Sequence, residues 1–473
     1  MNDKKSLFII ILIILVTFCY FIYTEQLIGI LVLIGICITF YVLPIYFFSS
    51  KKLMYAIAFL TPLSFDFLLG GNKISFPNEL LMMLALVFFC VKILSGYKLK
   101  ASIFKHPMSI IIYFFLFWMI LTSIFSVSPL VSIKRTIMQS SFYLVFYFLL
   151  LHVFSSTKSY KTFFKLYILG CILPIAKSLN SHSVWNFVQE ASLYVSMPFF
   201  DEHTLYAACL AFVIPFIIIQ IGLSKTVIKR SFHIVLSVLF LIAFYFSYSR
   251  AAWISLIISA LFYLFIRLKI KFWQINMLLI SSVLALSYYS DSIYSSMREN
   301  NSKYNDNAAH HLTSVTNLRS DASNLERINR WVCAYRMFLE KPLTGFGPGT
   351  YQFEYGAFQT NEFTTRISSH DGTKGNAHSE FFGVLSEMGL PGLIAFITLV
   401  FYTIKLGLKN IYTLQAKKDV ALATCIILGL ITFYCHGFFN SFIDNSKISI
   451  LVIGSMATLV FLDLKNRSHG KQY

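Results

Sequence analysis

The chain has 473 residues, of which 57% are hydrophobic and only 13% are charged. A soluble domain carries about 25% charged residues, and it lacks repeated apolar runs of about 20 residues, the length that crosses a bilayer. These values exclude a soluble globular protein and predict an integral membrane protein. Because the runs are continuously apolar and do not alternate, they favour an all-α bundle of membrane helices over a β-barrel.

The net charge of +18 has two possible origins. In a soluble protein it would indicate nucleic-acid binding. In a membrane protein, loops rich in Lys and Arg stay on the cytoplasmic side, and this rule accounts for a basic chain without a nucleic-acid partner. We therefore expect no nucleic acid to bind.

Fourteen apolar runs are candidate membrane helices, with twelve helices as the alternative count. The first run resembles a signal peptide, but Tyr23 to Glu25 offer no small-residue cleavage site, so we count it as a helix. The runs 232–248 and 251–267 form a hairpin that turns near Ser247 to Arg250. In chain order the runs span residues 6–24, 27–48, 53–69, 79–95, 107–126, 136–154, 161–178, 204–223, 232–248, 251–267, 272–290, 380–404, 419–437 and 447–463.

The connections between these runs alternate in charge. One set is basic and includes the two termini, Lys51 with Lys52, and Lys417 with Lys418. The other set is mixed or acidic and includes the long polar loop 291–379. The positive-inside rule then predicts that both termini are cytoplasmic and that the long loop lies outside. The chain divides into helices 1–11 over residues 1–290, the loop 291–379, and helices 12–14 with a cytoplasmic tail over residues 380–473.

Within the loop, the stretch from Arg298 to Asn324 is rich in Asn and Ser, whereas an ordered helix is predicted from Leu325 until Pro342 ends it. Its apolar residues recur at helical spacing. Trp331 and Tyr335 suit a membrane interface, so we expect this helix to lie on or near the outer surface. The apolar positions are Leu325, Ile328, Val332, Tyr335 and Leu339.

A glycine-rich segment follows, Gly345-Phe-Gly-Pro-Gly-Thr-Tyr351. A phosphate cradle is one interpretation, but the segment lacks the Lys-Ser/Thr that completes a P-loop. A turn after the helix is the simpler interpretation, because glycine and proline supply turn conformations.

Four side chains are candidates for chemistry at the outer surface. His378 comes two residues before a membrane helix, and a neutral imidazole accepts a proton from a sugar hydroxyl. Arg250 lies in the short turn between two helices, and Arg327 and Arg330 lie on the loop helix. We expect all three arginines to be diphosphate-binding residues. Helix capping, snorkelling and a solvated helix face are the structural alternatives for these residues.

Together these residues form a chemically coherent set. Two guanidiniums bind a diphosphate bidentately and stabilise the charge of a diphosphate leaving group, while the imidazole activates an incoming hydroxyl. This set predicts glycosyl transfer from a polyprenyl-diphosphate sugar with neither a cofactor nor a metal. The competing arrangement is a carboxylate and metal site, for which the outer-loop residues Asp66, Glu79, Asp201, Glu202 and His203 are candidates.

The sequence resembles the O-antigen ligase and O-antigen polymerase superfamily over about residues 200–400. The resemblance rests on Phe246-Ser-Tyr-Ser-Arg-Ala-Ala252, Arg327 with Trp331, Pro342-Leu-Thr-Gly-Phe-Gly-Pro-Gly349 and the segment from His378 to Gly389. Phe200-Asp-Glu-His-Thr-Leu-Tyr206 also resembles the family's segment before a mid-chain helix. It implies a multi-pass protein of the bacterial inner membrane, with its large loop in the periplasm.

The resemblance also implies an activity in lipopolysaccharide biosynthesis. The donor would be an undecaprenyl-diphosphate glycan bound by Arg250 and Arg327, with His378 as the base. The acceptor would be the hydroxyl of lipid A–core in a ligase, a second lipid-linked glycan in a polymerase, or a Ser/Thr in a protein O-oligosaccharyltransferase. A flippase or transporter is the alternative of a different class, but it would place charges deep within the helices.

Overall fold

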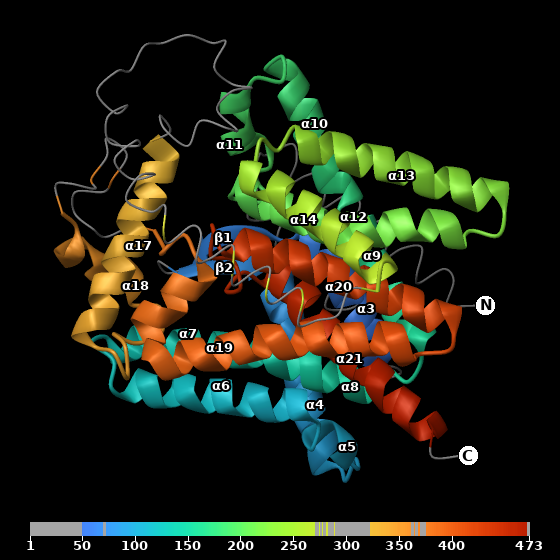
Figure 1. The fold of residues 1–473 in the computed structure, drawn as a ribbon, viewed down its shortest axis with the longest axis horizontal. Helices are drawn as coiled ribbons and strands as arrows, with labels where there is room; N and C mark the ends of the chain where they lie inside the picture. The colour runs from blue at the N-terminus through green and yellow to red at the C-terminus, as the bar shows by residue number, and fades with distance from the viewer. Residues whose placement is uncertain are drawn as a thin grey trace, which may run out of the picture.

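The fold is a bundle of long α-helices, shown by a computed structural model (Figure 1). The structure describes residues 50–69, 72–269, 322–360 and 375–470, together with the single residues 274, 277, 281, 288, 364 and 368. Within these residues nine helical segments are long and apolar enough to cross a membrane. The prediction of an all-α polytopic membrane protein is confirmed. The predicted helices 6–24 and 27–48, and most of 272–290, lie outside the described residues.

The first described segment contains less helix than the sequence predicts. The predicted helix 53–69 is wrong beyond Leu60, because α3 (Ser50–Leu60) gives way to a short 3₁₀ turn (η1, Thr61–Leu63) and an antiparallel hairpin. The hairpin consists of β1 (Phe65–Leu69) and β2 (Asn72–Phe76). Pro62 at the turn limits continuation of the helix. The Phe65 and Phe76 rings, 6.0 Å apart, form a cross-strand pair.

The next helices follow the predicted order with shifted ends. They are α4 (Asn78–Leu94), α5 (Ala101–Phe104), α6 (Pro107–Ile124), the span Pro129–Val153 and the span Thr157–Val184. The last two spans are each composite: α7 (Pro129–Tyr143), a π-helical turn η2 (Leu144–Leu149) and α8 (Leu150–Val153), then α9 (Thr157–Gly170) and α10 (Ile172–Val184).

The predicted start of one helix at residue 136 is wrong, and its connection through Arg135 is helical. Pro129 occupies the first turn of α7, where proline's fixed φ favours helix and its missing N–H costs no hydrogen bond. Arg135 therefore projects from a helix rather than from a loop. The predicted segment 161–178 is likewise too short at both ends, since the Ser156 side chain caps the helix at the Ser159 N–H.

The central helices form the core of the bundle. After two short turns, η3 (Gln189–Ala191) and α11 (Ser192–Val195), come α12 (His203–Leu223), α13 (Val227–Tyr245) and α14 (Arg250–Arg267). The predicted turn between residues 247 and 250 is confirmed. α20 (Lys417–Gly437) packs against α12, α14 and α19 (Glu380–Thr413), and α21 (Ser446–Gly470) packs beside it. Most residues of α20 and α21 are buried.

The predicted end of α19 at residue 404 is also wrong. The helix bends at Gly389, where φ is +67°, and Pro391 follows, yet it continues to Thr413. Its last turns carry Lys409, whose ammonium lies 2.5 Å from the Asp463 carboxylate of α21. This ion pair lets a lysine sit within the helix, where the charge pattern alone predicts a connection.

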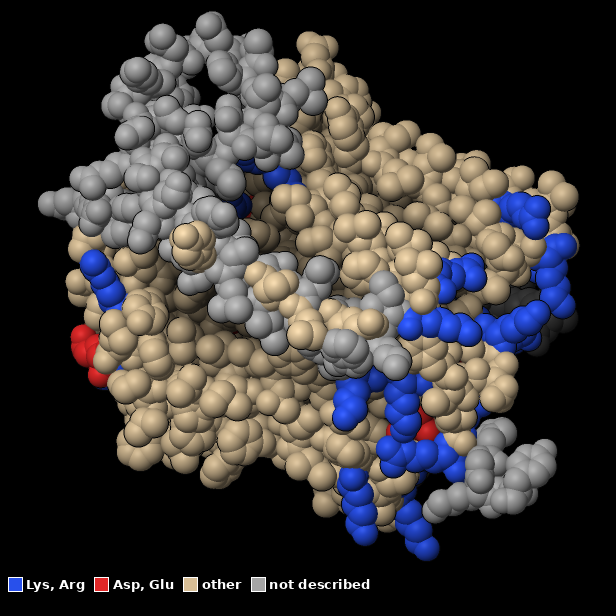
Figure 2. All heavy atoms as spheres, in the orientation of Figure 1, with Lys and Arg blue, Asp and Glu red and all other residues tan. Residues whose placement is uncertain are grey.

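Two ends of the bundle differ in structure and charge. α17 (Ala322–Glu340) runs across the ends of the long helices instead of along them, with α18 (Tyr351–Glu354) and the 3₁₀ turn η6 (Tyr355–Phe358) close by (Figure 1). The Lys and Arg side chains visible in Figure 2 gather mainly at the opposite end, where α13 begins and α21 ends.

Candidate functional site

α17 forms at the place predicted from the loop sequence, but its packed face differs from the predicted one. Tyr335 and Leu339, part of the predicted apolar stripe, are exposed, at 49% and 57% of their surface. The buried face is instead Glu326, Asn329, Arg330, Cys333, Ala334 and Met337. The polar members of this face make contacts that helical periodicity of apolar residues does not reveal.

Trp331 fixes α17 to the rest of the site. Its ring stacks on Phe382 of α19 at 5.5 Å and meets Phe438, just beyond α20, edge-on at 5.6 Å. Its indole N–H donates a hydrogen bond of 3.2 Å to the carbonyl oxygen of His378. One side chain thus joins α17 to the segments that begin α19 and end α20.

His378 has a constrained backbone directly before α19. Its φ is +48°, a left-handed conformation that L-residues rarely adopt and that often marks a functional position. Its N–H donates to Asn376 Oδ1 at 2.9 Å, and the following residue, Ser379, caps α19 by accepting from the Phe382 N–H. These bonds, with that from Trp331, hold the backbone of His378 on both sides.

Burial and two arginines keep the His378 imidazole neutral. Burial, together with the charges of Arg330 and Arg327, lowers the pKa of His378 to about 3, although a hydrogen bond with the Asn440 side chain raises it. At neutral pH the ring is uncharged and one of its nitrogens carries a free lone pair for a proton.

Arg327 and Arg250 come together from different helices. Arg327 Nε donates a hydrogen bond of 3.3 Å to the Phe439 carbonyl. Burial and the nearby charge of Arg250, the first residue of α14, together lower the pKa of Arg327 to about 10. Two guanidiniums repel each other in a partly buried place, which makes this position favourable for an anion.

Arg330 is engaged differently from Arg327. Its Nε lies 2.8 Å from Glu326 Oε1, its Nη1 donates to the Asn376 carbonyl at 3.0 Å, and its guanidinium stacks over the Tyr355 ring at 4.8 Å. The side chains of Arg330 and Glu326 are only 8% and 6% exposed. A Cβ added to Gly375 would lie 2.4 Å from Arg330 Nη1, so the glycine permits this close approach.

The loop after α20 and the start of α12 also contribute to the site. The sequence assigned His203 only to the competing metal arrangement and gave His436 no role. Electrostatic interactions link Arg327 with His203 and His436. The His436 ring is 1% exposed, and neither of its nitrogens has a hydrogen-bond partner among the described residues. Only the sequence His436-Gly-Phe-Phe-Asn440, polar residues at the end of an apolar run, hints at this contribution.

The glycine-rich segment is a packed turn, as the simpler interpretation predicts. Gly345, Gly347 and Gly349 have φ values of +65°, +111° and +79°. The N–H groups of Gly345, Phe346 and Gly347 donate to backbone carbonyls, the last two to Ser386 and Glu387 of α19. Since these donors are occupied, the segment does not offer the row of free N–H groups that a phosphate cradle requires.

The acidic residues proposed for the competing metal site have separate local surroundings. Asp66 accepts a hydrogen bond from the Ser75 hydroxyl within the hairpin, and Glu79 lies in the first turn of α4. Glu202 precedes α12, and its side chain makes no capping hydrogen bond with that helix. The described part of the chain holds no group of three or more His, Cys, Asp or Glu that could bind a metal ion.

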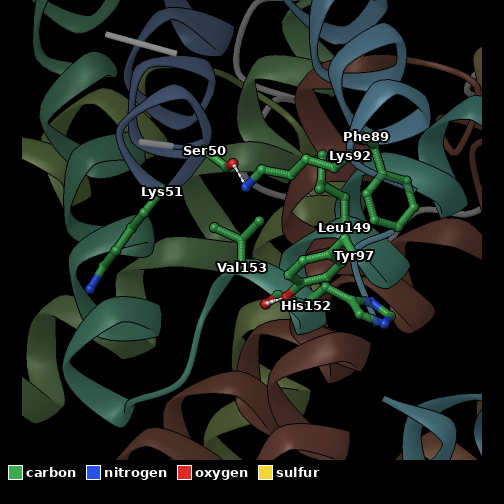
Figure 3. A pocket seen from close by; sticks show the side chains of 8 residues that line it. All are labelled: Ser50, Lys51, Phe89, Lys92, Tyr97, Leu149, His152 and Val153. Atoms are coloured by element: carbon green, nitrogen blue, oxygen red, sulfur yellow. Dashed lines mark hydrogen bonds between the residues drawn. The ribbon is translucent and has the colours of Figure 1, made fainter. Parts of the chain in front are cut away.

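A separate cavity of about 260 Å³ lies among the start of α3, the end of α4 and the end of α8. Figure 3 shows Lys92 reaching Ser50, with Tyr97 and His152 below them and Lys51 pointing away. None of the four predicted site residues lines this cavity.

The fold and site define a class of protein: a polytopic helical membrane protein with buried arginines and a neutral histidine at one end of its bundle. Residues 235–397 match the family model described as O-antigen ligase, Wzy_C. The match covers about a third of the chain and supports the O-antigen ligase and polymerase superfamily, whose members are glycosyltransferase-like enzymes. The match runs from α13 into α19 and includes Arg250, Arg327, Arg330 and His378. No curated protein matches the chain.

Proposed function

We propose that the protein transfers a glycan from undecaprenyl diphosphate to an acceptor hydroxyl, that of lipid A–core, without a metal. The observation that carries this proposal is the approach of Arg250 and Arg327 beside a neutral His378. A diphosphate relieves the repulsion between the two guanidiniums and pairs with their planar N–H groups. The membrane helices and the superfamily domain support a lipid-linked substrate.

The reaction follows from these positions. His378 accepts the proton of the acceptor hydroxyl as its oxygen attacks the anomeric carbon of the donor sugar. The bond between that carbon and the diphosphate oxygen breaks, and undecaprenyl diphosphate leaves with the electron pair. Arg250 and Arg327 stabilise the negative charge that develops on the leaving group. The proton on His378 then passes to solvent or to the diphosphate.

Arg330 has a positioning role in this proposal rather than direct contact with the diphosphate. Its contacts with Glu326, Tyr355 and the Asn376 carbonyl secure the segment that leads into His378. Asn376 in turn accepts the His378 N–H. Arg330 therefore acts indirectly, by holding the backbone segment that carries the His378 side chain.

The orientation proposed for the chain places α17 and the site at the periplasmic face of the bacterial inner membrane, with both termini cytoplasmic. The Lys and Arg side chains at the opposite end of the bundle support this orientation (Figure 2). The exposed Tyr335 and Leu339 of α17 suit contact with the outer leaflet.

Diphosphate binding by the arginines is tested with purified protein and undecaprenyl diphosphate. Arg327→Ala is expected to weaken the affinity by roughly tenfold to a hundredfold, since hydrogen bonds to charged groups contribute about 1.5–3 kcal/mol. Arg336→Ala is the matched control, because Arg336 lies on the same helix and donates to the Phe358 carbonyl. Equal affinity in the two variants would contradict the proposal.

The acceptor is identified by transfer assays with three mixtures. Product on lipid A–core supports the proposed ligase. Elongated lipid-linked glycan with donor alone indicates a polymerase, and product on an added Ser/Thr-rich protein indicates a protein O-oligosaccharyltransferase. Transfer in none of the mixtures would contradict the glycosyltransferase assignment, provided that the purified protein binds the donor.

A further inference from the structure

A second polar cavity lies beside the site. It has a volume of about 250 Å³ and is enclosed by α6, α7, α19 and the segments around Gly349, Asn376 and Ser441. At its edge Arg135 Nη1 lies 2.5 Å from Asp444 Oδ2, and these side chains are 22% and 39% exposed. Its edge therefore meets solvent, while the side chains farther in are buried.

Contacts with protein groups already occupy the acidic side chains of this cavity. Glu380 Oε1 accepts from the N–H groups of Phe442 and Ile443 at 2.5 and 2.7 Å. Glu387 Oε1 accepts from the Tyr351 N–H at 3.1 Å. Carboxylates held in this way are poorly arranged to converge on a cation.

Gln139 provides an acceptor that the protein does not use. It projects from α7 into the cavity and is 3% exposed. Its Oε1 has no hydrogen-bond partner among the described residues. An unpaired buried polar atom is destabilising, and a ligand that brings a hydroxyl donor removes that cost.

The lining of the cavity limits the ligand further. Three carboxyl residues, Glu380, Glu387 and Asp444, face one cationic side chain, Arg135. A second anion such as a diphosphate would find only the Arg135 guanidinium as a cationic partner, and Asp444 already engages it. Apolar side chains share the lining, among them Phe115 and Phe396. Hydroxyl-binding groups beside aromatic rings are suited to a sugar, which has both hydroxyls and apolar C–H faces.

We infer that this cavity binds a hydroxyl-rich saccharide unit without an anionic group, a neutral or amino sugar, next to the proposed base. Asn376 and Ala377 line the cavity, and Asn376 Oδ1 accepts the N–H of His378. Only Asn376 and Ala377 therefore lie between a saccharide in this cavity and the backbone of His378. The inference rests on the proposed function, and the saccharide belongs to either the acceptor or the donor glycan.

The direct test measures binding of the purified full-length protein to an array of neutral, amino and acidic oligosaccharides. Two variants perturb the cavity. Gln139→Met removes the acceptor with little change in size, and Gly383→Leu places a side chain into the cavity, since a Cβ at Gly383 meets only Ala377, at 3.8 Å. The matched control is Gln220→Met, because Gln220 is also buried with an unpartnered side-chain atom but lies on α12 outside the cavity.

The inference predicts binding of neutral or amino saccharides in preference to acidic ones. Gln139→Met is expected to weaken binding about threefold to tenfold, in line with one lost hydrogen bond, and Gly383→Leu to abolish it. The melting temperature of Gln139→Met is expected not to fall, because the variant removes an unpaired buried atom. Absence of saccharide binding, a preference for acidic saccharides, or unchanged binding in Gln139→Met would overturn the inference.

Steady-state transfer assays separate the two sources of the saccharide. If the cavity holds the acceptor, Gln139→Met raises the KM for the acceptor alone. If it holds the donor glycan, the KM for the donor rises instead, and a change in neither contradicts the inference. Saccharide binding to His378→Ala is expected to persist even though transfer is lost. A failure of the proposed transfer reaction can therefore be told apart from a failure of the cavity to bind saccharide.

Discussion

The buried ion pair between Glu326 and Arg330 is the strongest test of the positioning role. Both side chains are less than a tenth exposed, and they lie one helical turn apart on α17. Three variants are compared: Glu326→Leu, Arg330→Met and the double variant. Each single change leaves one charge buried without its partner.

The expected magnitudes follow from burial. Removal of one partner of a buried ion pair costs about 3–5 kcal/mol of unfolding free energy, because the remaining charge is desolvated and has lost its opposite charge. The double variant removes both charges and loses three contacts, which contribute about 1 kcal/mol each: the Tyr355 stacking, the bond to the Asn376 carbonyl and the bond from the Ser368 hydroxyl to Glu326. It is therefore expected to cost roughly 3 kcal/mol, well below the sum of the two single variants.

Denaturant unfolding of the purified protein in detergent, followed by tryptophan fluorescence, measures these costs. The affinity for undecaprenyl diphosphate is measured on the same samples. Positioning by Arg330 predicts that the double variant recovers stability and part of the affinity relative to Arg330→Met. Additive losses of stability would refute the buried-pair argument. Recovered stability with no recovery of affinity would instead mean that Arg330 contacts the diphosphate directly.

Three further predictions concern the same end of the bundle. Arg327→Lys is expected to lower kcat/KM by roughly tenfold to a hundredfold, because an ammonium cannot replace the planar fork, and steady-state kinetics at saturating acceptor measures this. The pKa of His378 lies at about 3 in the free protein, and the neutral form is the base. Transfer is therefore lost as pH falls through that pKa, and a bound diphosphate, which offsets the arginine charges, is expected to move the acid limb of kcat to higher pH than that of kcat/KM. Coincident limbs would contradict this. Gly347→Ala is expected to lower the melting temperature, because its Cβ would lie 2.1 Å from Ser126 Oγ and its φ is +111°; an unchanged melting temperature would show that the turn relaxes.

Long apolar runs and helix-ending residues allowed much of the fold to be predicted. The turn between α13 and α14, the position of α17 and the start of α19 at Glu380 follow from hydropathy, Pro342 and the polar residues around His378. These features depend on the residues of one short stretch of sequence, so local periodicity is enough to predict them.

Features that depend on contacts between distant segments could not be predicted. Phe65 and Phe76 pair across a hairpin in a stretch apolar enough to resemble a helix. Arg330 resembled its neighbour Arg327 until its contacts with Glu326 and Tyr355 were seen. The ring nitrogens of His436 and the Oε1 atom of Gln139 are buried without a hydrogen-bond partner among the described residues. Sequence spacing does not encode this property.

The most direct measurement of the central claim is glycan transfer by purified protein in EDTA, with an undecaprenyl-diphosphate glycan as donor and lipid A–core as acceptor. His378→Ala is compared with His233→Ala, since His233 lies on α13 and contacts Ser224 away from the site. We predict transfer in EDTA by the unmodified protein and by His233→Ala, and its loss in His378→Ala. Transfer that requires an added divalent metal, or that survives in His378→Ala, would contradict a metal-independent reaction with His378 as the base.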